Sequence, residues 1–141
     1  MFDTFVLDGS VASGRITGDD CYFMKLHLRD VEHKIQIVQQ RLVEMLEGIT
    51  LGQLMAYRLG RMKDAGTMKH TQVSLAKRHN VMMARNVASL ARWTLGANGV
   101  HSEYQVMRHM ANIESVFTYE GTHDIHTLVV GQDITGISAF E

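Results

Sequence analysis

Proline is absent from this 141-residue chain, so no ring clash interrupts a helix anywhere along it. Cysteine occurs once, at Cys21, which excludes an internal disulfide and fits a reducing compartment. No apolar run approaches the roughly 18–20 residues of a membrane span, and the N-terminus lacks the basic and apolar regions of a secretory signal. The net charge of −1 gives no electrostatic case for a nucleic-acid or membrane-surface partner. We therefore expect neither nucleic-acid binding nor membrane insertion.

The composition is that of a globular domain, with 45% hydrophobic and 21% charged residues. The length allows one domain with a sizeable core and is too short for two. Residues 1–30 carry three glycines and an Asp-Asp pair that indicate turns, and they contain no motif. We therefore expect an irregular N-terminal segment over residues 1–30 and a helical bundle over residues 31–141.

Apolar residues recur at spacings of three and four from about residue 31, which predicts a long amphipathic helix. Asp30 is its candidate N-cap, and residues 63–66 are typical of its C-terminal exit. The stripe comprises Ile35, Val38, Leu42, Met45, Ile49, Gly52, Ala56 and Leu59.

The same spacing predicts three more helices. One starts near His70 and ends at residues 95–99, where Gly or Asn can take the left-handed C-cap conformation. Another runs from about Ser102, its candidate N-cap, to Thr118, and the last runs from Thr122 to about Asp133. The fold class is therefore all-α, an antiparallel helical bundle with short connections. Trp93, Tyr104 and Phe117 are most simply core aromatics. Lys77 and Arg78 belong to a set of cations that we expect on solvated faces, and the alternative is that some of them meet a ligand's phosphates.

Glu120 is the first candidate for chemistry, because it stands between two predicted helices and directly before Gly121. A carboxylate that leans into an apolar cleft there would have a raised pKa, which suits a general base. The alternative is a solvated acid at the start of a helix, favoured by the helix dipole. Spacing alone favours this alternative.

A metal site is the competing chemistry. Glu120 and His123 form a Glu-x-x-His motif, but a ferritin-like di-iron centre needs two such motifs and the chain has one. His123 and His126 share a helix face, yet no third zinc ligand stands at a convincing spacing. We predict no metal site and interpret the two histidines as a surface or interface pair.

The segment Thr-Tyr-Glu-Gly-Thr-His-Asp-Ile-His at residues 118–126 resembles the C-terminal signature of acyl-CoA dehydrogenases. Its His-Asp-Ile-His ending resembles the glutaryl-CoA dehydrogenase branch of that family. The resemblance covers about residues 34–140, and further matches occur in family order with family spacing. These are Ile-Thr-Leu-Gly at 49–52, Leu-Gly-Arg at 59–61 with Lys-Asp at 63–64, Val-Ser-Leu at 73–75, Lys-Arg at 77–78, Leu-Gly-Ala-Asn-Gly at 95–99, Glu-Tyr at 103–104 and Arg-His at 108–109.

The resemblance implies a C-terminal helical bundle whose Glu120 removes the α-proton of an acyl-CoA thioester while FAD takes the β-hydrogen as hydride. It also implies an electron-transfer acceptor as a partner, and a cytoplasmic location, or the mitochondrial matrix in a eukaryote. Gly121 would serve substrate binding by supplying the backbone freedom that aims Glu120. The residues implied to contact FAD are Tyr119, Thr122 and Asp124 near the flavin, Gly96, Ala97 and Gly99 from a neighbouring subunit, and Gln36 near the adenine.

The chain also departs from the family pattern. The family has a helical domain, a β domain and a first bundle helix before this region, and residues 1–30 resemble none of them. Ala97 replaces the second glycine of the usual Gly-Gly-Asn-Gly, and the family's Arg-x-Gln-Phe-Gly segment has no counterpart. We therefore expect a fragment with an exposed apolar stripe that favours a homo-oligomer. The alternative function is an inactive helical self-association module derived from the family.

Overall fold

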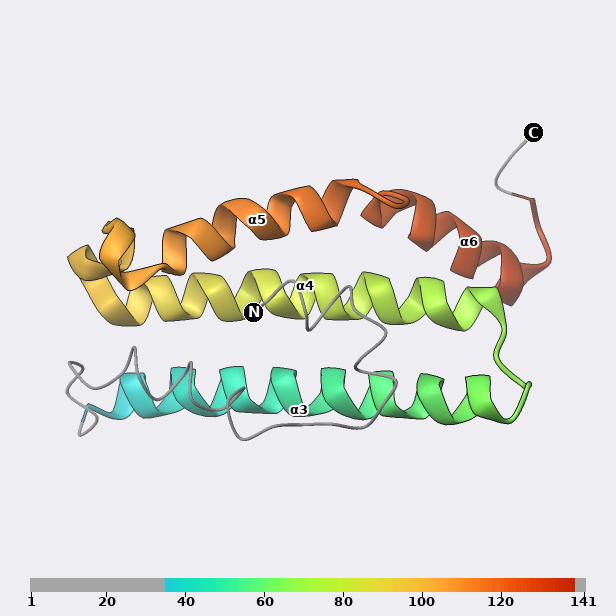
Figure 1. Ribbon diagram of the computed structural model, residues 1–141, viewed down its shortest axis with the longest axis horizontal. Coiled ribbons are helices and arrows are strands. Elements are labelled where there is room, and N and C mark those ends of the chain that lie inside the picture. Colours follow the sequence, from blue (N-terminus) through green and yellow to red (C-terminus); the bar gives the residue numbers. More distant parts are fainter. Residues whose placement is uncertain (1–34, 139–141) are drawn as a thin grey trace.

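The computed structural model describes residues 35–138, and these form helices with no β-strand among them. α4 (His70–Leu95) lies in the middle, with α3 (Gln36–Asp64) along one side and α5 (Val106–Thr118) and α6 (His123–Thr135) along the other (Figure 1). α5 and α6 follow each other in a row that runs antiparallel to α4 (Figure 1). The predicted all-α antiparallel fold is confirmed.

Small residues allow α3 and α4 to pack closely. Val38, Met45 and Gly52 are buried on α3 at intervals of seven residues, which is the spacing of a single helix face. A Cβ atom at Gly52 would lie 2.9 Å from Met83 Cε and 3.0 Å from Asn80 Oδ1. The predicted apolar stripe of this helix therefore faces α4.

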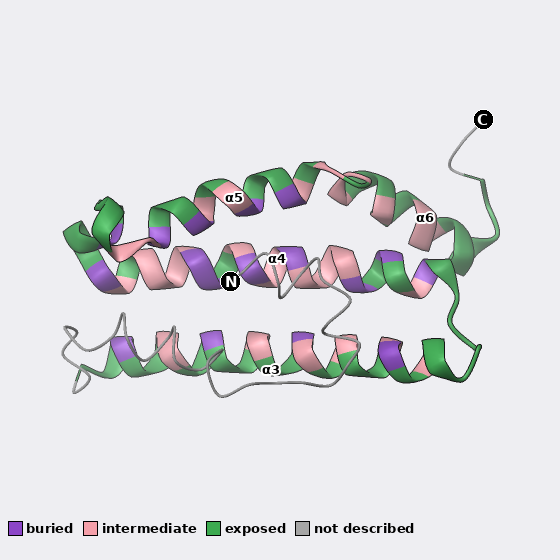
Figure 2. Ribbon diagram, viewed as in Figure 1, coloured by how far each residue is buried: buried purple, intermediate pink, exposed green. Residues whose placement is uncertain are grey.

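The core between α4 and α5 is built from Val81 and Ala84 of α4 with Ile113 and Val116 of α5. Phe117 and Tyr119 pack against this cluster at the C-terminal end of α5. Both sides of α4 carry buried residues (Figure 2), as expected for the central layer of a bundle.

Two predicted helix starts need correction. α3 begins at Gln36 after an extended Ile35, and the candidate cap Asp30 lies outside the described residues. Ser102 does not cap α5: it opens the short 3₁₀ helix η3 (Ser102–Tyr104), and α5 begins four residues later at Val106 after Gln105, whose φ is 61°. The predicted helix therefore merged two elements that a left-handed residue separates.

The predicted ends are more accurate. α3 ends at Asp64, α4 begins at His70 and ends at Leu95, and Thr122 caps α6 by accepting a hydrogen bond from the Ile125 amide. A second short 3₁₀ helix, η2 (Gly96–Val100), follows α4 directly. Among residues 35–138, no helix combines the length and apolar character needed to cross a membrane.

The face of α3 that points away from α4 carries four exposed large apolar side chains. Val43, Leu46, Leu54 and Tyr57 are all at least 49% exposed, and their spacing places them on one side of the helix. Four large apolar side chains on one helix face are more than the scattered exposure normal for a monomer surface. The sequence predicts an exposed apolar stripe, and these residues form one on α3.

Candidate functional site

The turn between α5 and α6 has an unusual backbone. α5 ends at an extended Tyr119, and the next two residues, Glu120 and Gly121, have φ angles of 55° and 89°. Glycine adopts such angles freely, whereas the left-handed conformation at Glu120 costs roughly 1–2 kcal/mol. The side chain of Glu120 is exposed at this turn. Strain at a charged residue needs support from the surrounding structure.

Lys77 of α4 supplies that support. Its Nζ atom donates hydrogen bonds to the backbone oxygens of Tyr119 and of Gly121, the second at 2.6 Å. The same atom lies 5.4 Å from the centroid of the Tyr119 ring, within the range of a cation–π contact. Hydrogen bonds from a charged donor stabilise by about 1.5–3 kcal/mol each, enough to offset the strain at Glu120.

Burial lowers the pKa of Lys77, and the neighbouring charge of Glu120 opposes that shift. The charge of Glu120 therefore favours the charged form of Lys77. Lys77 was expected to lie on a solvated face, and this interpretation is wrong. Lys77 stands three, four and seven residues from buried Ser74, Val81 and Ala84, a register that places it on the packed face of α4.

The two histidines of α6, interpreted from the sequence as a surface or interface pair, are half-buried and packed into the turn. The His123 ring stacks on Phe117, with centroids 4.8 Å apart and an angle of 11° between the planes. The His126 ring lies beneath Gly121, where an added Cβ atom would approach Nε2 to 3.0 Å. Within residues 35–138, no group of three or more His, Cys, Asp or Glu side chains could hold a metal ion.

His126 has a lowered pKa. Burial is the main cause, and the positive charge of Lys77 adds to it, whereas the backbone oxygens of Glu120 and Gly121 act in the opposite direction. The neutral imidazole is therefore the form that fits beneath the turn. A protonated His126 would place a second positive charge near the ammonium of Lys77.

The N-terminus of α6 is held to α4 by a second cation. Arg78 donates from Nε to the Thr127 hydroxyl at 2.8 Å, one helical turn beyond His123. Thr122 caps the helix through its Oγ1 atom, 3.2 Å from the Ile125 amide. Asp124 is exposed in the first turn, where a negative charge complements the helix dipole.

The remaining predicted site residues lie elsewhere in the fold. Gly96, Ala97 and Gly99 belong to η2, at the C-terminal end of α4, and Gln36 is the first residue of α3 at the same end of the bundle (Figure 1). About 18 residues of α4 separate η2 from Lys77, a length of roughly 27 Å at 1.5 Å per residue. One copy of the chain therefore does not bring both groups of predicted residues to one place.

Gly99 is buried and tightly packed, whereas Gly96 and Ala97 are exposed. A Cβ atom at Gly99 would lie 2.5 Å from the backbone oxygen of Arg92, which leaves no room for a side chain. Gly96 has a φ of 58° and terminates α4. Both glycines therefore have a structural reason to be where they are, independent of any ligand.

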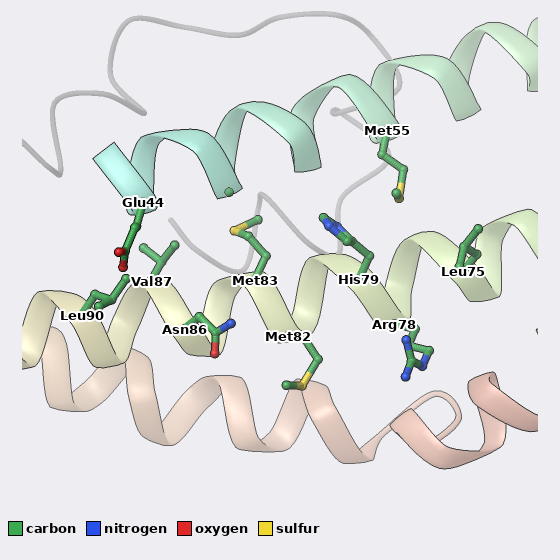
Figure 3. A pocket seen from close by; sticks show the side chains of 11 residues that line it. Glu44, Met55, Leu75, Arg78, His79, Met82, Met83, Asn86, Val87 and Leu90 are labelled. Atoms are coloured by element: carbon green, nitrogen blue, oxygen red, sulfur yellow. The ribbon is translucent and has the colours of Figure 1, made fainter. Parts of the chain in front are cut away.

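A pocket of about 470 Å³ lies between α3 and α4 (Figure 3). Met55 of α3 and Met83 of α4 project into the space between the helices, with Glu44 near Val87 and Leu90 at one end (Figure 3). Glu120 does not line it. This pocket is therefore separate from the turn that carries the candidate base.

Residues 31–135 match the acyl-CoA dehydrogenase, C-terminal domain, and the chain belongs to this family. The short-chain specific acyl-CoA dehydrogenase of Megasphaera elsdenii is 29% identical over 98 residues, which cover 70% of this chain and 26% of that protein. A glutaryl-CoA dehydrogenase from Mycobacterium smegmatis has a similar structure, with a TM-score of 0.80 and 43% identity over 87% of this chain and 33% of that one.

A glutaryl-CoA dehydrogenase from Mycobacterium smegmatis in complex with FADH2 is also similar, with a TM-score of 0.80 and 34% identity over 97% of this chain and 36% of that chain. The family resemblance seen in the sequence is thus confirmed. The chain spans between 26% and 36% of the length of these relatives.

Proposed function

We propose that this chain is the C-terminal helical part of a flavin-dependent acyl-CoA dehydrogenase of the glutaryl-CoA type, with Glu120 as the base that removes the α-proton of the acyl thioester. The observation that carries the proposal is the turn itself. Glu120 is exposed on a strained backbone between two packed helices, and the two residues beside it are held from α4 by Lys77. Family membership supplies the reaction class.

The chain's own residues would perform the acid–base part of this reaction. The carboxylate of Glu120 would accept the proton from the α-carbon, and hydrogen bonds to the thioester oxygen would acidify that carbon. Gly121 adopts its positive φ without strain, and Glu120 beside it is exposed at the break between α5 and α6. Neutral His126 lies below Gly121 and adds no charge that competes for the carboxylate.

The residues at the N-terminus of α6 fit one end of FAD. Thr122 uses a lone pair of its hydroxyl to cap the helix and keeps its O–H free to donate to a flavin oxygen. Asp124 and the aromatic ring of Tyr119 flank the same turn. When bound, FAD would supply the acceptor for the β-hydrogen, which leaves as hydride.

The other predicted contacts are at the far end of α4, in η2 and at Gln36. Because one copy keeps the two groups roughly 27 Å apart along α4, we propose that two copies build each FAD site. α6 of one copy would face the flavin, and Gly96, Ala97 and Gly99 of the other would approach the rest of the molecule. A separate electron acceptor would then reoxidise the flavin.

The test uses the purified 141-residue chain. FAD binding is followed by flavin absorbance, and turnover is measured with glutaryl-CoA or butyryl-CoA and an artificial electron acceptor. Glu120→Gln should keep FAD and lose turnover by at least about 100-fold, because general-base catalysis contributes roughly 10²–10⁴-fold. Glu114→Gln is the matched control, since Glu114 is an exposed acid on α5 that pairs with Arg85 of α4. A folded, FAD-loaded chain without turnover excludes catalysis by this chain.

A second candidate function is self-association without catalysis. The observation in its favour is the exposed apolar face of α3, formed by Val43, Leu46, Leu54 and Tyr57. Light scattering separates the two candidates when it is combined with the flavin spectrum. A colourless oligomer that a Leu46→Asp, Leu54→Asp double variant dissociates would favour the association module, whereas a colourless monomer would count against it.

A further inference from the structure

We propose that Lys77 is the positioning residue of the Glu120 turn: its ammonium holds the backbone oxygens on both sides of Glu120 and so fixes the direction in which the carboxylate points. This inference rests on the proposed role of Glu120 as the base. Lys77 does not touch the reacting atoms. It acts through the backbone of residues 119–121.

Two backbone oxygens accept hydrogen bonds from Lys77. The backbone oxygens of Tyr119 and Gly121 belong to peptide groups two residues apart, and both bond to the same Nζ atom. In an extended segment, oxygens of alternate residues lie too far apart to share one small donor. The positive φ angles of Glu120 and Gly121 are what bring these two oxygens to a common point. One ammonium can therefore bond to both oxygens in the left-handed form of the turn and not in an extended form.

The neighbouring cations of α4 are engaged with other groups. Arg78 bonds to the hydroxyl of Thr127 on α6, and Arg85 pairs with Glu114 and lies 4.3 Å from the centroid of Phe117. Lys77 is also held from the side by the Tyr119 ring. Because Arg78 and Arg85 are bonded to these other groups, we do not expect either of them to replace the ammonium when Lys77 is lost.

The charges around Lys77 are consistent with its position at the turn. The groups that face Lys77 across the turn are Glu120, which attracts its charge, and His126, whose neutral form avoids it. The ammonium thus faces a carboxylate and an uncharged imidazole.

The test compares Lys77→Met with Arg78→Met. Methionine keeps the aliphatic length of Lys77 without a donor, and Arg78 is the adjacent cation that bonds to a side chain of α6. The backbone conformation of Glu120 is measured by nuclear magnetic resonance, because a positive φ gives a strong contact between its own amide and Hα protons. Lys77→Met should lose this signal or divide it among several conformers, and Arg78→Met should keep it.

Chemical rescue separates the role of the ammonium from a simple loss of packing. In a Cys21→Ser background, a Lys77→Cys variant should lose the left-handed signal, and treatment of its thiol with bromoethylamine should restore it. The treated side chain carries an ammonium of nearly the same reach as lysine. Restoration with the ammonium, including restoration of folding where Lys77→Cys is poorly folded, supports the proposal.

Turnover gives an independent readout. Lys77→Met should lower kcat by about tenfold to 100-fold and change KM less than about threefold, because substrate binding is retained while the base is misdirected. A Lys77→Met variant with an unchanged Glu120 signal and unchanged kcat would overturn the inference. If Glu120→Gln is as active as the unchanged chain, the proposed function fails, and the magnetic resonance measurement still decides whether Lys77 holds the turn.

Discussion

Replacing Gly121 with alanine tests the geometry of the turn most directly. The φ angle of Gly121 is 89°, and an alanine Cβ atom there would lie 3.0 Å from Nε2 and 3.2 Å from Cε1 of His126. A left-handed backbone costs an L-residue roughly 1–2 kcal/mol. The contact with the imidazole adds to this because the His126 ring packs beneath the turn. We expect a total loss of about 2–4 kcal/mol in the free energy of unfolding.

Gly66→Ala is the matched control for the backbone term. Gly66 has a φ of 67°, and nothing lies within 4 Å of the position that an added Cβ atom would take, so only the strain of the left-handed backbone applies. We expect it to lose about 1–2 kcal/mol. The difference between the two variants measures the contact with His126. In urea, with a slope of about 2 kcal/mol per molar, Gly121→Ala should move the unfolding midpoint down by at least about 1 M.

A double-mutant cycle isolates the imidazole. His126→Ala removes the ring that the new methyl group meets, so Gly121→Ala should cost less in the His126→Ala background than in the unchanged chain. The coupling should be about 1 kcal/mol or more, as for other residues in direct contact. Equal losses from Gly121→Ala and Gly66→Ala, with no coupling to His126, would refute this account of the turn.

Further predictions concern the other glycines and the pH dependence. Gly99→Ala should lower the free energy of unfolding by about 3 kcal/mol or more, because its Cβ atom would lie 2.5 Å from the backbone oxygen of Arg92. Gly131→Ala, in the open part of α6, should be neutral or stabilising. Thermal unfolding of the two variants checks this, and similar melting temperatures would contradict it. The pKa of His126 is lower in the folded chain than its ordinary value of 6.5, so the unfolded chain binds the proton more readily. Its contribution to stability is therefore full above about pH 6.5 and is lost as the pH falls through the lowered pKa. The stability difference between the unchanged chain and His126→Gln, measured by urea unfolding, should shrink from pH 7.5 to pH 5, and a growing difference would show that the sign is wrong.

The sequence predicted those parts of the fold that depend on local periodicity. α4 was placed correctly from His70 to Leu95 because its apolar spacing is regular and glycine follows its last residue. The start of α5 was misplaced because Gln105 adopts a left-handed conformation that is more typical of glycine. The residue type at this position does not indicate that conformation. Trp93 was expected in the core but is 53% exposed. Residue type alone cannot show which face of α4 remains uncovered.

The sequence resemblance implies a set of site residues that a single copy of the chain does not bring together. The signature around Glu120 and the glycines of η2 both carry the family pattern, but roughly 27 Å of α4 separates them within one copy. The resemblance implies that the glycines of η2 come from a neighbouring subunit, and their distance from the Glu120 turn within one copy agrees with that implication.

Lys77 shows where a sequence signal was present and was interpreted wrongly. Its charge suggested solvent, yet its register with Ser74, Val81 and Ala84 puts it on the packed face of α4. A partly buried lysine on such a face gains from nearby acceptors, because desolvation disfavours an unpaired ammonium. The break between α5 and α6 lies opposite this position and presents two backbone oxygens that have left the helical pattern. The cation needs acceptors and the turn needs a donor, so the packing of α5 and α6 against α4 satisfies both and places the turn that carries Glu120.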